Sequence, residues 1–568
     1  MSLVASIRPP ILSTCRRTPF RSFKKPRLTR LSSTSRSKDF YATTPIFYVN
    51  ADPHIGHLHS SLLADVYTRW NRLREPERKA WMMTGTDEHG LKIQRVAEAK
   101  GEDPKVLCDR VSERFRDLVK ASNVDASVFI RTTEERHRIA VQHVWRDLEK
   151  RGFIYKSAYA GWYAVSDEAY YAENQVQETI DPKSGERYMA SIETGTRVEW
   201  MEEENYKFKL SAFREPLLTW LQSKPNPVQP PSRTTALLAS LAHPSSTDLS
   251  DLSISRPSSR LTWGIPVPSD PSHTIYVWID ALVNYLTVAG YPWNDSSAAT
   301  KTWPPDLQVV GKDIIRFHAL YLPAVLMALD LPLPKHLLTH GHWTMDRFKM
   351  SKSRGNVANP FEAMELWSTD AIRMYLMTKG GNSASDADYS EAEIERFYKK
   401  ELAGQMGNLL ARVTGKKLVK KLAGRVERLW TMPEKFEEED KELVGLLKEL
   451  PDTFASHLST FEIHRSLSLL FDVLNTANKH ISTLSPWLPS ATPSQIHRSL
   501  YLSCESLRIS AILLQPFMPE KSRVLLDALG AGEEARKWEN VGFGRGGERR
   551  EPSLIKGGLW PVVEVVKK

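Results

Sequence analysis

The residues whose chemistry stands out first are two histidines and a glycine in the run Pro53-His54-Ile55-Gly56-His57. The run follows a β-branched and aromatic stretch, residues 40–50, and precedes apolar residues that recur every three or four positions from Leu58 to Leu73. This pattern predicts a strand, a turn and then a helix that buries one face. Because a helix N-terminus carries unpaired N–H groups and partial positive charge, we expect the turn to hold a phosphate, with the glycine allowing close approach. For an isolated match, the alternative is that both histidines only cap the helix.

A second candidate for phosphate binding is the run Lys349-Met350-Ser351-Lys352-Ser353, which is followed by Arg354-Gly355-Asn356 and then by Pro360. Serine, glycine and proline favour a mobile loop at this place. Its two lysines could close over a triphosphate as point charges. The alternative, for a lone pair of lysines at this spacing, is a solvated surface loop.

An acidic loop, Gly85-Thr86-Asp87-Glu88-His89-Gly90, follows a short apolar run at residues 81–84. In open parallel sheets ligands bind at the carboxyl ends of the strands, so we expect this loop to share a crevice with His54 and His57. An acid at that place suits a ligand ammonium group. Alternatively, Asp87 and Glu88 only cap the helix predicted from Leu91.

The elements that must position these residues alternate between strand and helix. Alternation over residues 39–154 favours an α/β unit with a parallel, Rossmann-like sheet, which residues 256–390 are predicted to complete. We interpret residues 155–255 as a connective insertion rich in β-structure, with a flexible Pro-, Ser- and Thr-rich stretch at 224–250. After residue 390 the strand signal ends, and residues 391–568 are predicted to form an all-α domain.

The composition is ordinary for a soluble globular protein, with 41% hydrophobic and 26% charged residues in 568. No apolar run approaches the roughly 18 residues that a membrane-spanning helix needs, so we expect no membrane insertion. Cys15, Cys108 and Cys504 lie too far apart in the sequence for a disulfide framework or a Cys-x-x-Cys metal knuckle. We therefore expect a reducing compartment and no structural zinc.

The formal net charge of +9 is concentrated at the N-terminus. Residues 1–38 hold ten Lys or Arg and no Asp or Glu, which leaves a charge of −1 on the remainder. An arginine-rich, serine-rich and acid-free start predicts a disordered mitochondrial presequence; the alternative is a basic arm that binds RNA. A polyanionic partner must then bind a local basic patch, and the lysine cluster at residues 416–421, which follows Asn408 and Arg412, is one.

The two phosphate motifs, about 290 residues apart in this order, are far more specific together than alone. The chain resembles the class I aminoacyl-tRNA synthetases, whose hallmarks are a HIGH tetrapeptide and a KMSKS loop; both stand here without substitution. Other runs are similar to those of the methionyl-tRNA synthetase family: Thr44 to Asn50, Thr84 to Gly90, Asp251 to Arg256, Trp263-Gly264-Ile265-Pro266 and Gly311-Lys312-Asp313-Ile314. The likeness covers residues 39–487.

The resemblance implies a methionine–tRNA ligase that uses ATP with Mg²⁺. Methionine would attack the α-phosphorus of ATP, and the resulting methionyl group would pass to the terminal adenosine of tRNA(Met). In the family, the ATP site falls on His54, Gly56, His57, Asp313, Lys349 and Lys352, where His54, His57, Lys349 and Lys352 also have the catalytic role of neutralising phosphate charge.

The family's methionine site falls on Ile46, Tyr48, Asp87, Trp278, Tyr285 and His318. Asp87 would pair with the substrate ammonium, and aromatic walls favour a polarisable thioether. A neutral His318 or a Tyr hydroxyl could donate a weak hydrogen bond to the sulfur. Taken from the residues alone, Trp278 and Tyr285 fit core packing equally well.

The resemblance places recognition of the CAU anticodon on Asn408, Arg412 and Trp487. Amides and guanidinium groups can bond base edges, and an indole can stack on an unpaired base. In this sequence Ala164 and Asp167 stand where many relatives have a zinc-binding Cys pair, so zinc is not expected. We also expect a monomer located in the mitochondrial matrix.

Two other functions remain open from the sequence. One is a class I synthetase for leucine, isoleucine, valine or cysteine, although the insertion is short for an editing domain and lacks zinc ligands. The other is a non-catalytic or dual-role RNA-binding protein on the same fold, acting in intron splicing or regulation. Intact HIGH and KMSKS motifs argue against loss of the chemistry.

Overall fold

The computed structural model describes most of the chain from Lys38 onward. Of the predicted presequence, residues 1–38, it describes only Lys38. The described residues are 38–165, 169–171, 173–181, 184–242, 249–293, 301–345, 347–350, 358–415, 418, 430–546 and 553–563.

A parallel sheet of seven strands lies at the centre of the described structure, in the order β10-β16-β15-β1-β3-β2, with β4 beside β3. Its strands are β1 (Phe40–Thr43), β2 (Phe47–Tyr48), β3 (Ala80–Asp87), β4 (Val128–Arg131), β10 (Val228–Gln229), β15 (Leu307–Gly311) and β16 (Leu337–His340). The strands β1, β15 and β16 are buried along their whole length, as expected when helices cover both faces. The predicted Rossmann-like α/β class is confirmed, and β15 and β16 complete the sheet that β1 and β3 begin.

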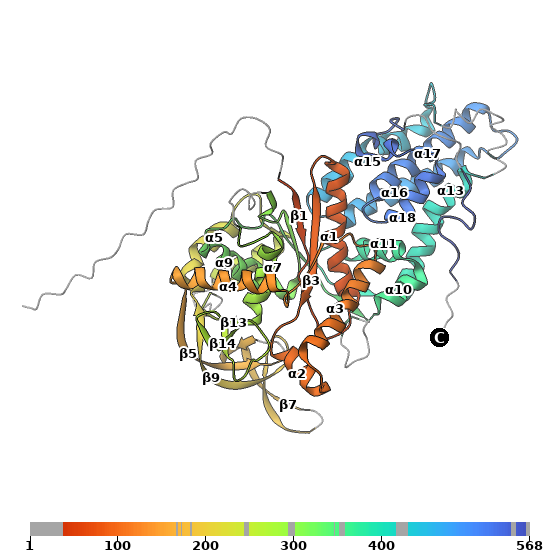
Figure 1. The fold of residues 1–568 in the computed structure, drawn as a ribbon. Coiled ribbons are helices and arrows are strands. Elements are labelled where there is room, and N and C mark those ends of the chain that lie inside the picture. The colour runs from red at the N-terminus through yellow and green to blue at the C-terminus, as the bar shows by residue number, and fades with distance from the viewer. Residues whose placement is uncertain are drawn as a thin grey trace, which may run out of the picture. The chain divides into compact units, whose positions relative to one another are not determined.

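Helices cover both faces of this sheet (Figure 1). Helix α1 (Ile55–Arg74) packs against one face, in a core that includes Phe40 and Ala42. Helices α4 (Glu135–Lys150) and α7 (Val277–Val288) pack on the other, in a core that includes Tyr41 and Met83. The alternation along β1 therefore assigns successive side chains to opposite cores.

Helix α1 is buried more completely than its apolar pattern predicts. Leu58, Leu62, Val66 and Trp70 are buried, as expected, but Ser60, Ser61 and Asp65 are buried too. The reason is that the helical C-terminal region packs on the side of α1 that faces away from the sheet, and both belong to one continuous core. The helix that begins at the histidine motif thus lies between the sheet and the C-terminal helices.

Most strands of the region predicted as a β-rich insertion form a second sheet, which is antiparallel. Its strands run in the order β6-β5-β9-β8-β7, with β11 (Leu252–Ser253) beside β9. They are β5 (Ile154–Ala164), β6 (Ala169–Tyr171), β7 (Val176–Ile180), β8 (Arg187–Ser191) and β9 (Arg197–Phe208).

The expectation of a flexible loop at residues 224–250 is wrong for its first part. Strand β10 joins the central sheet beside β16, and helix α6 (Pro231–Ala242) follows it. The proline and serine content suggested a loop. The helix forms nevertheless, because Pro231 occupies a first-turn position where proline is tolerated, and Leu237 and Leu241 bury the apolar face of the helix. Residues 243–248 lie outside the described residues.

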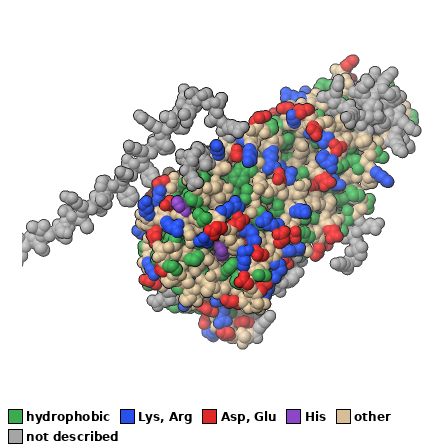
Figure 2. All heavy atoms as spheres, in the orientation of Figure 1, with side chains coloured by type: hydrophobic (Ala, Val, Ile, Leu, Met, Phe, Trp, Pro, Cys, Tyr) green, Lys and Arg blue, Asp and Glu red, His purple; other side chains and the backbone are tan. Residues whose placement is uncertain are grey.

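After residue 390 the described structure is helical, as predicted. Helix α12 (Glu391–Phe397) continues through a π-helical segment, Tyr398–Gly407, into α13 (Asn408–Val413). The bundle then contains α15 (Lys441–Ser459), α16 (Ile463–Leu484), α17 (Pro493–Leu514) and α18 (Pro519–Ala528). No helix in the described part of the chain has the length and apolar character needed to cross a membrane. On the face shown in Figure 2, positive and negative side chains are interspersed, as the nearly neutral body predicts.

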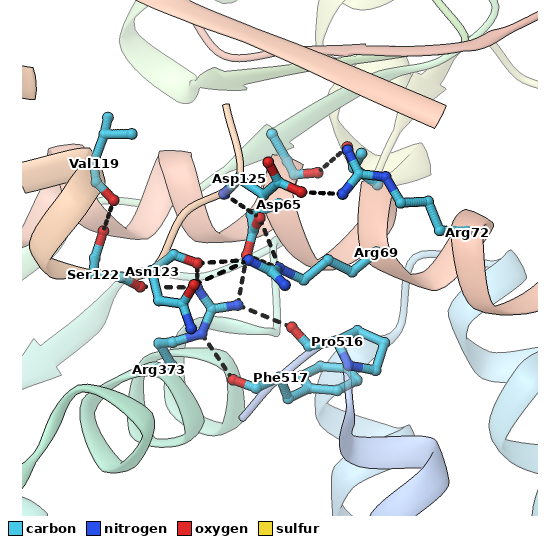
Figure 3. A network of polar contacts seen from close by, with 12 residues as sticks. Asp65, Arg69, Arg72, Val119, Ser122, Asn123, Asp125, Arg373, Pro516 and Phe517 are labelled. Atoms are coloured by element: carbon cyan, nitrogen blue, oxygen red, sulfur yellow. Dashed lines mark hydrogen bonds and ion pairs between the residues drawn. The ribbon is translucent and has the colours of Figure 1, made fainter. Parts of the chain in front are cut away.

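A buried ion pair joins α1 to the C-terminal helices (Figure 3). The Arg373 side chain, on α11 (Thr369–Gly380), donates from Nη2 to Asp65 Oδ2 of α1 at 2.5 Å, and neither side chain is exposed to solvent. The same guanidinium donates to the carbonyls of Phe517 at 2.9 Å, Pro516 at 2.9 Å and Ser122 at 3.1 Å. Arg373 therefore connects α1, the end of α3 (Pro104–Ala121) and the turn between α17 and α18.

Replacing Arg373 should destabilise the protein strongly. We expect Arg373→Met to lower the free energy of unfolding by about 3 kcal/mol, because it leaves the buried Asp65 carboxylate and four backbone carbonyls without this donor. Arg69, which also donates to Asp65 at 3.0 Å, limits the loss. Denaturant unfolding measures the change, with Arg396→Met as control, since Arg396 is 65% exposed. Equal unfolding midpoints for the two variants would contradict this role.

Candidate active site

The histidine motif caps helix α1. The N-cap residue, His54, accepts a hydrogen bond at Nδ1 from the Gly56 N–H at 3.0 Å, and its own N–H donates to Nδ1 of His57 at 3.1 Å. The two rings stack with centroids 3.8 Å apart. Because Nδ1 accepts in both rings, a neutral ring carries its proton on Nε2, and a phosphate would be bound through Nε2–H. The capping role and the phosphate role, which were alternatives in the sequence, are thus compatible.

Gly56 is required by the cap itself. A Cβ atom at this position would lie 2.8 Å from Cε1 of His54, which is closer than real Cβ contacts. Any side chain at position 56 would therefore displace the His54 ring. The glycine serves the geometry of the two histidines as well as ligand approach.

Asp313 lies just after β15, at the same carboxyl edge of the sheet, in the turn Lys312–Ile314. Its carboxylate lies 3.2 Å from Nε2 of His342. Burial alone would raise the pKa of Asp313, but the hydrogen bond and charge of His342 lower it to about 2, so the carboxylate is ionised at neutral pH. Two residues before His342, at the end of β16, His340 bonds Ser60 of α1 at 2.8 Å, which fixes the first turns of α1 to this edge.

A pocket of about 290 Å³ opens at this edge of the sheet. It is lined by residues from the β1–β2 region, the end of β3, helix α7 and the segment after β15. All six predicted methionine-site residues are among its walls: Ile46, Tyr48, Asp87, Trp278, Tyr285 and His318. Lys92 and Asn284 also line it, and the sequence did not single them out.

Tyr285 and His318 form a buried pair in this pocket. The Tyr285 hydroxyl lies 2.7 Å from His318 Nε2, and His318 Nδ1 lies 2.9 Å from the carbonyl of Ile314. Since Nδ1–H donates to that carbonyl, Nε2 accepts and the tyrosine donates to it. Burial lowers the pKa of His318 to about 4 and raises the pKa of Tyr285, so both are neutral at pH 7. In this arrangement the Tyr285 hydroxyl donates its proton to His318, and the His318 ring donates its proton to the carbonyl of Ile314. Neither proton is directed at a substrate sulfur, although the sequence led us to expect this.

A buried carboxylate behind the pocket was missed in the sequence. Asp280 of α7 is fully buried and lies 2.7 Å from His89 Nδ1 and 2.7 Å from His137 Nε2. Burial alone would raise the pKa of Asp280, but the two histidines lower it to about 2. His89 is two residues from Asp87, and Asp280 is two residues from Trp278. This cluster therefore joins the acidic loop to the helix that forms the opposite wall.

Breaking this cluster should loosen the pocket. We expect Asp280→Asn to raise KM for methionine by about tenfold with little change in kcat, because one buried histidine loses its acceptor and the two walls are no longer joined. Steady-state pyrophosphate exchange measures both constants, and Asp330→Asn, at a 71% exposed side chain, is the control. An unchanged KM for methionine would show that Asp280 does not position the walls.

The KMSKS residues are described only in part. Lys349 lies at the end of β18 (Phe348–Lys349), which pairs with β17 (Trp343–Met345), but its side chain is outside the described part of the structure. Lys352 and the rest of residues 351–357 are also outside it. The structure therefore does not place these two amines.

The three predicted anticodon residues lie together on the helical region. Asn408 and Arg412 are on α13, and Trp487, which follows α16, is 41% exposed. The Arg412 guanidinium lies 5.8 Å from the centroid of the Trp487 ring and donates to Ser482 Oγ at 2.9 Å. An exposed indole beside a cation suits a stacking base better than the packing role that was its alternative. Residues 416–417 and 419–429, with most of the basic cluster, lie outside the described residues.

Of the two residues that stand where many relatives have a zinc-binding Cys pair, Ala164 ends β5, and Asp167 lies outside the described residues. Within the described ranges no group of three or more His, Cys, Asp or Glu side chains is arranged to hold a metal ion.

A parallel sheet with a HIGH-type helix cap, a pocket at the same edge and a C-terminal helical bundle is the arrangement of a class I aminoacyl-tRNA synthetase. The family model described as "tRNA synthetases class I (M)" matches residues 40–414. A probable mitochondrial methionine–tRNA ligase of Neurospora crassa is 44% identical over 515 residues, covering 89% of this chain and 82% of that protein. A Schizosaccharomyces pombe protein of the same name is 44% identical (91% and 94%), and the mitochondrial methionine–tRNA ligase of Homo sapiens is 41% identical (89% and 86%).

Among solved structures, Mycobacterium tuberculosis methionyl-tRNA synthetase in complex with methionyl-adenylate superposes with a TM-score of 0.84 at 36% identity, covering 92% of this chain and 100% of that one. The chain belongs to the methionyl-tRNA synthetase family and is of its mitochondrial type. The rival synthetases for other amino acids, and the non-catalytic alternative, are thereby disfavoured.

Proposed function

We propose that this enzyme activates L-methionine with ATP and transfers the methionyl group to tRNA(Met) for organellar translation. The observation that carries the proposal is the pocket in which Ile46, Tyr48, Asp87, Trp278, Tyr285 and His318 meet, at the edge of the sheet where α1 begins. The methionine carboxylate attacks the α-phosphorus of ATP, which gives methionyl-adenylate and pyrophosphate. A hydroxyl of the terminal adenosine of the tRNA then attacks the acyl carbon and releases AMP.

The ATP site of this proposal uses His54, Gly56 and His57 at the start of α1. Nε2–H of either histidine and the N-terminal backbone amides bind the phosphates. Asp313, ionised at neutral pH, accepts hydrogen bonds from the ribose hydroxyls. Lys349 and Lys352 neutralise the charge that builds on the leaving pyrophosphate, and Mg²⁺, bound with ATP, shares this role. No protein nucleophile is needed, so positioning and charge neutralisation supply the catalysis.

The methionine site of this proposal separates the two ends of the substrate. Asp87 pairs with the ammonium group. Ile46, Tyr48 and Trp278 form apolar walls for the thioether, and modest sulfur–aromatic contacts favour it over a branched aliphatic chain. Because Tyr285 and His318 bond each other, they serve as a rigid, neutral end wall that limits the length of the side chain.

The tRNA site of this proposal places the CAU anticodon on Asn408, Arg412 and Trp487. We expect Trp487→Ala to raise KM for tRNA about tenfold, because a stacked base loses its platform, while tRNA-independent pyrophosphate exchange is unchanged. Aminoacylation kinetics with tRNA(Met) transcript measure the first, and Trp200→Ala, at a 54% exposed tryptophan of the insertion, is the matched control. Unchanged tRNA kinetics in Trp487→Ala would remove it from the anticodon site.

Further parts of the proposal concern the whole chain. Residues 1–38 are a presequence that directs the enzyme to the mitochondrial matrix, where it acts as a monomer. The catalytic domain consists of residues 39–154 and 256–390, interrupted by a zinc-less insertion at 155–255 from which strand β10 returns to the central sheet, and residues 391–568 form the anticodon-binding domain.

Charging of a tRNA(Met) transcript with labelled methionine tests the proposed function. We expect acid-stable methionyl-tRNA to form in the presence of ATP and Mg²⁺, and a transcript with a changed anticodon to be charged far less. A protein that binds the transcript without charging it would instead favour the non-catalytic alternative.

A further inference from the structure

A second pocket, which we call the rear pocket, lies at the amino ends of the strands, opposite the edge that holds the methionine pocket. Its volume is about 370 Å³, within the range of small-molecule sites, roughly 300–1,000 Å³. Phe40 at the start of β1 and Leu307 at the start of β15 lie in its walls. The last turns of α1 and the residues that end α15 close it from the other side. The rear pocket therefore has no residue in common with the proposed active site.

The rear pocket carries an excess of positive charge. Asp306, one of its walls, accepts from three cations: Lys335 at 2.7 Å, Arg78 at 3.0 Å and Lys38 at 3.0 Å. Burial alone would raise the pKa of Asp306, but these partners lower it, so the carboxylate stays ionised. One carboxylate cannot balance three cations. Lys335 remains 51% exposed and can contact a ligand without leaving Asp306.

One further cation and one further carboxylate line the same pocket, and because their charges cancel, the net charge of the pocket stays positive. Arg74 lies 4.1 Å from the centroid of the Trp538 ring, and Glu75 lies 3.6 Å from Arg78. The pocket and its immediate partners thus hold four cations against two carboxylates, which favours an anionic ligand.

The floor of the rear pocket is aromatic and includes polar atoms without a partner. Tyr67 is only 4% exposed, and its hydroxyl has no hydrogen-bond partner among the described residues. Burial raises the pKa of Tyr67, so the hydroxyl keeps its proton and is an unused donor. Nδ1 of His336 likewise has no partner there, and burial lowers the pKa of this ring, so it is neutral. A buried donor without an acceptor is costly, and a ligand that supplies one is favoured.

Phe461, which follows the end of α15, belongs to the same aromatic lining. Its φ is 62°, a left-handed conformation that a bulky residue rarely adopts. Its ring centroid lies 5.3 Å from that of Tyr67 and 5.3 Å from that of His336. Phe40 and Trp70 also line the pocket, so its apolar lining is largely aromatic, which suits a planar ligand.

We propose that the rear pocket is a binding site for a nucleoside monophosphate. The base packs against the aromatic floor, its edge bonds the Tyr67 hydroxyl and His336 Nδ1, and the phosphate contacts Lys335 and Arg78. AMP, which the second step of the proposed reaction releases, belongs to this class and is the probe of choice. The site stands on the rear pocket alone and does not require the proposed activity.

Equilibrium binding of AMP to the full chain tests the site, with the catalytic pocket first filled by a non-hydrolysable methionyl-adenylate analogue. We expect one further equivalent of AMP to bind with a Kd below about 1 mM, and adenosine and inorganic phosphate to bind at least about tenfold more weakly. Absence of binding up to 5-fold above that concentration, or equal binding of phosphate alone, would overturn the proposal.

Two variants give the test a structural control. Tyr67→Phe should weaken AMP binding about tenfold yet leave the melting temperature unchanged or higher, because the lost hydroxyl has no protein partner. Tyr155→Phe, which removes a hydroxyl that bonds Asp251 at 2.7 Å, should lower the melting temperature and leave AMP binding unchanged. Lys335→Ala should weaken AMP binding about fivefold, whereas the exposed Lys435→Ala should not. AMP binding that is equal in Tyr67→Phe and wild type, or destabilisation by Tyr67→Phe, would contradict the site.

Discussion

Lys352→Ala should lower the rate of methionyl-adenylate formation by roughly 10²–10⁴-fold while leaving the affinity for methionine nearly intact. The reason lies in where charge develops. As the α-phosphorus is attacked, negative charge accumulates on the leaving pyrophosphate, and an amine that contacts it only in the transition state contributes to kcat rather than to substrate binding. Single-turnover formation of the adenylate and equilibrium methionine binding measure the two quantities separately.

The matched control for Lys352 is Lys435→Ala, at a lysine whose side chain is 76% exposed and bonds Glu437. Lys352→Arg keeps the charge but changes its geometry, so we expect it to recover part of the lost rate. A Lys352→Ala enzyme with near-normal pyrophosphate exchange would remove Lys352 from the catalytic residues.

Asp87→Asn should lower kcat/KM for methionine by about a thousandfold with little change in KM for ATP. Asp87 is a wall residue of the pocket, together with Tyr48 and Trp278. The asparagine keeps the shape of the side chain but leaves the substrate ammonium without its counter-charge. Pyrophosphate exchange at varied methionine measures the loss.

An analogue of methionine without the ammonium group separates charge pairing from a general distortion of the pocket. Its binding should be equal in wild type and Asp87→Asn, whereas binding of methionine should differ. If both ligands lose affinity equally, Asp87 shapes the pocket and does not pair with the ammonium.

The histidine motif shows which parts of the site could be predicted from the sequence. His54, Gly56 and His57 are adjacent in the chain, and their helix-capping geometry follows from local spacing. The walls of the methionine pocket required the family resemblance, because Tyr48, Asp87 and Tyr285 come from three elements whose contact depends on the order of strands in the sheet.

The cluster of Asp280, His89 and His137 could not be predicted in the same way. Asp280 bonds residues 191 and 143 positions away, and no local pattern identifies such partners. His89 lies in the acidic loop, where only the acids were predicted to have a role, so its contact with Asp280 was not predicted. A buried carboxylate on an otherwise apolar helix, such as Asp280 between Ile279 and Leu282, is the signal that could have found it.

Helix α6 and the burial of α1 differ from expectation for one reason, which is tertiary packing. The Pro- and Ser-rich composition at 224–250 predicted a loop, because composition does not show that Leu237 and Leu241 are buried against other parts of the chain. Likewise Asp65 has the spacing of a polar-face residue of α1, and its burial depends on a partner, Arg373, that lies 308 positions away in the sequence. Composition and periodicity carry no information about a partner that arrives from another region of the chain.

Pyrophosphate exchange measured with each of the twenty amino acids tests the central claim most directly. The account predicts ATP–pyrophosphate exchange with methionine alone, since the pocket holds a counter-charge for the ammonium and aromatic walls closed by the Tyr285–His318 pair. Exchange with leucine, isoleucine, valine or cysteine at a comparable rate, or no exchange with any amino acid, would contradict it.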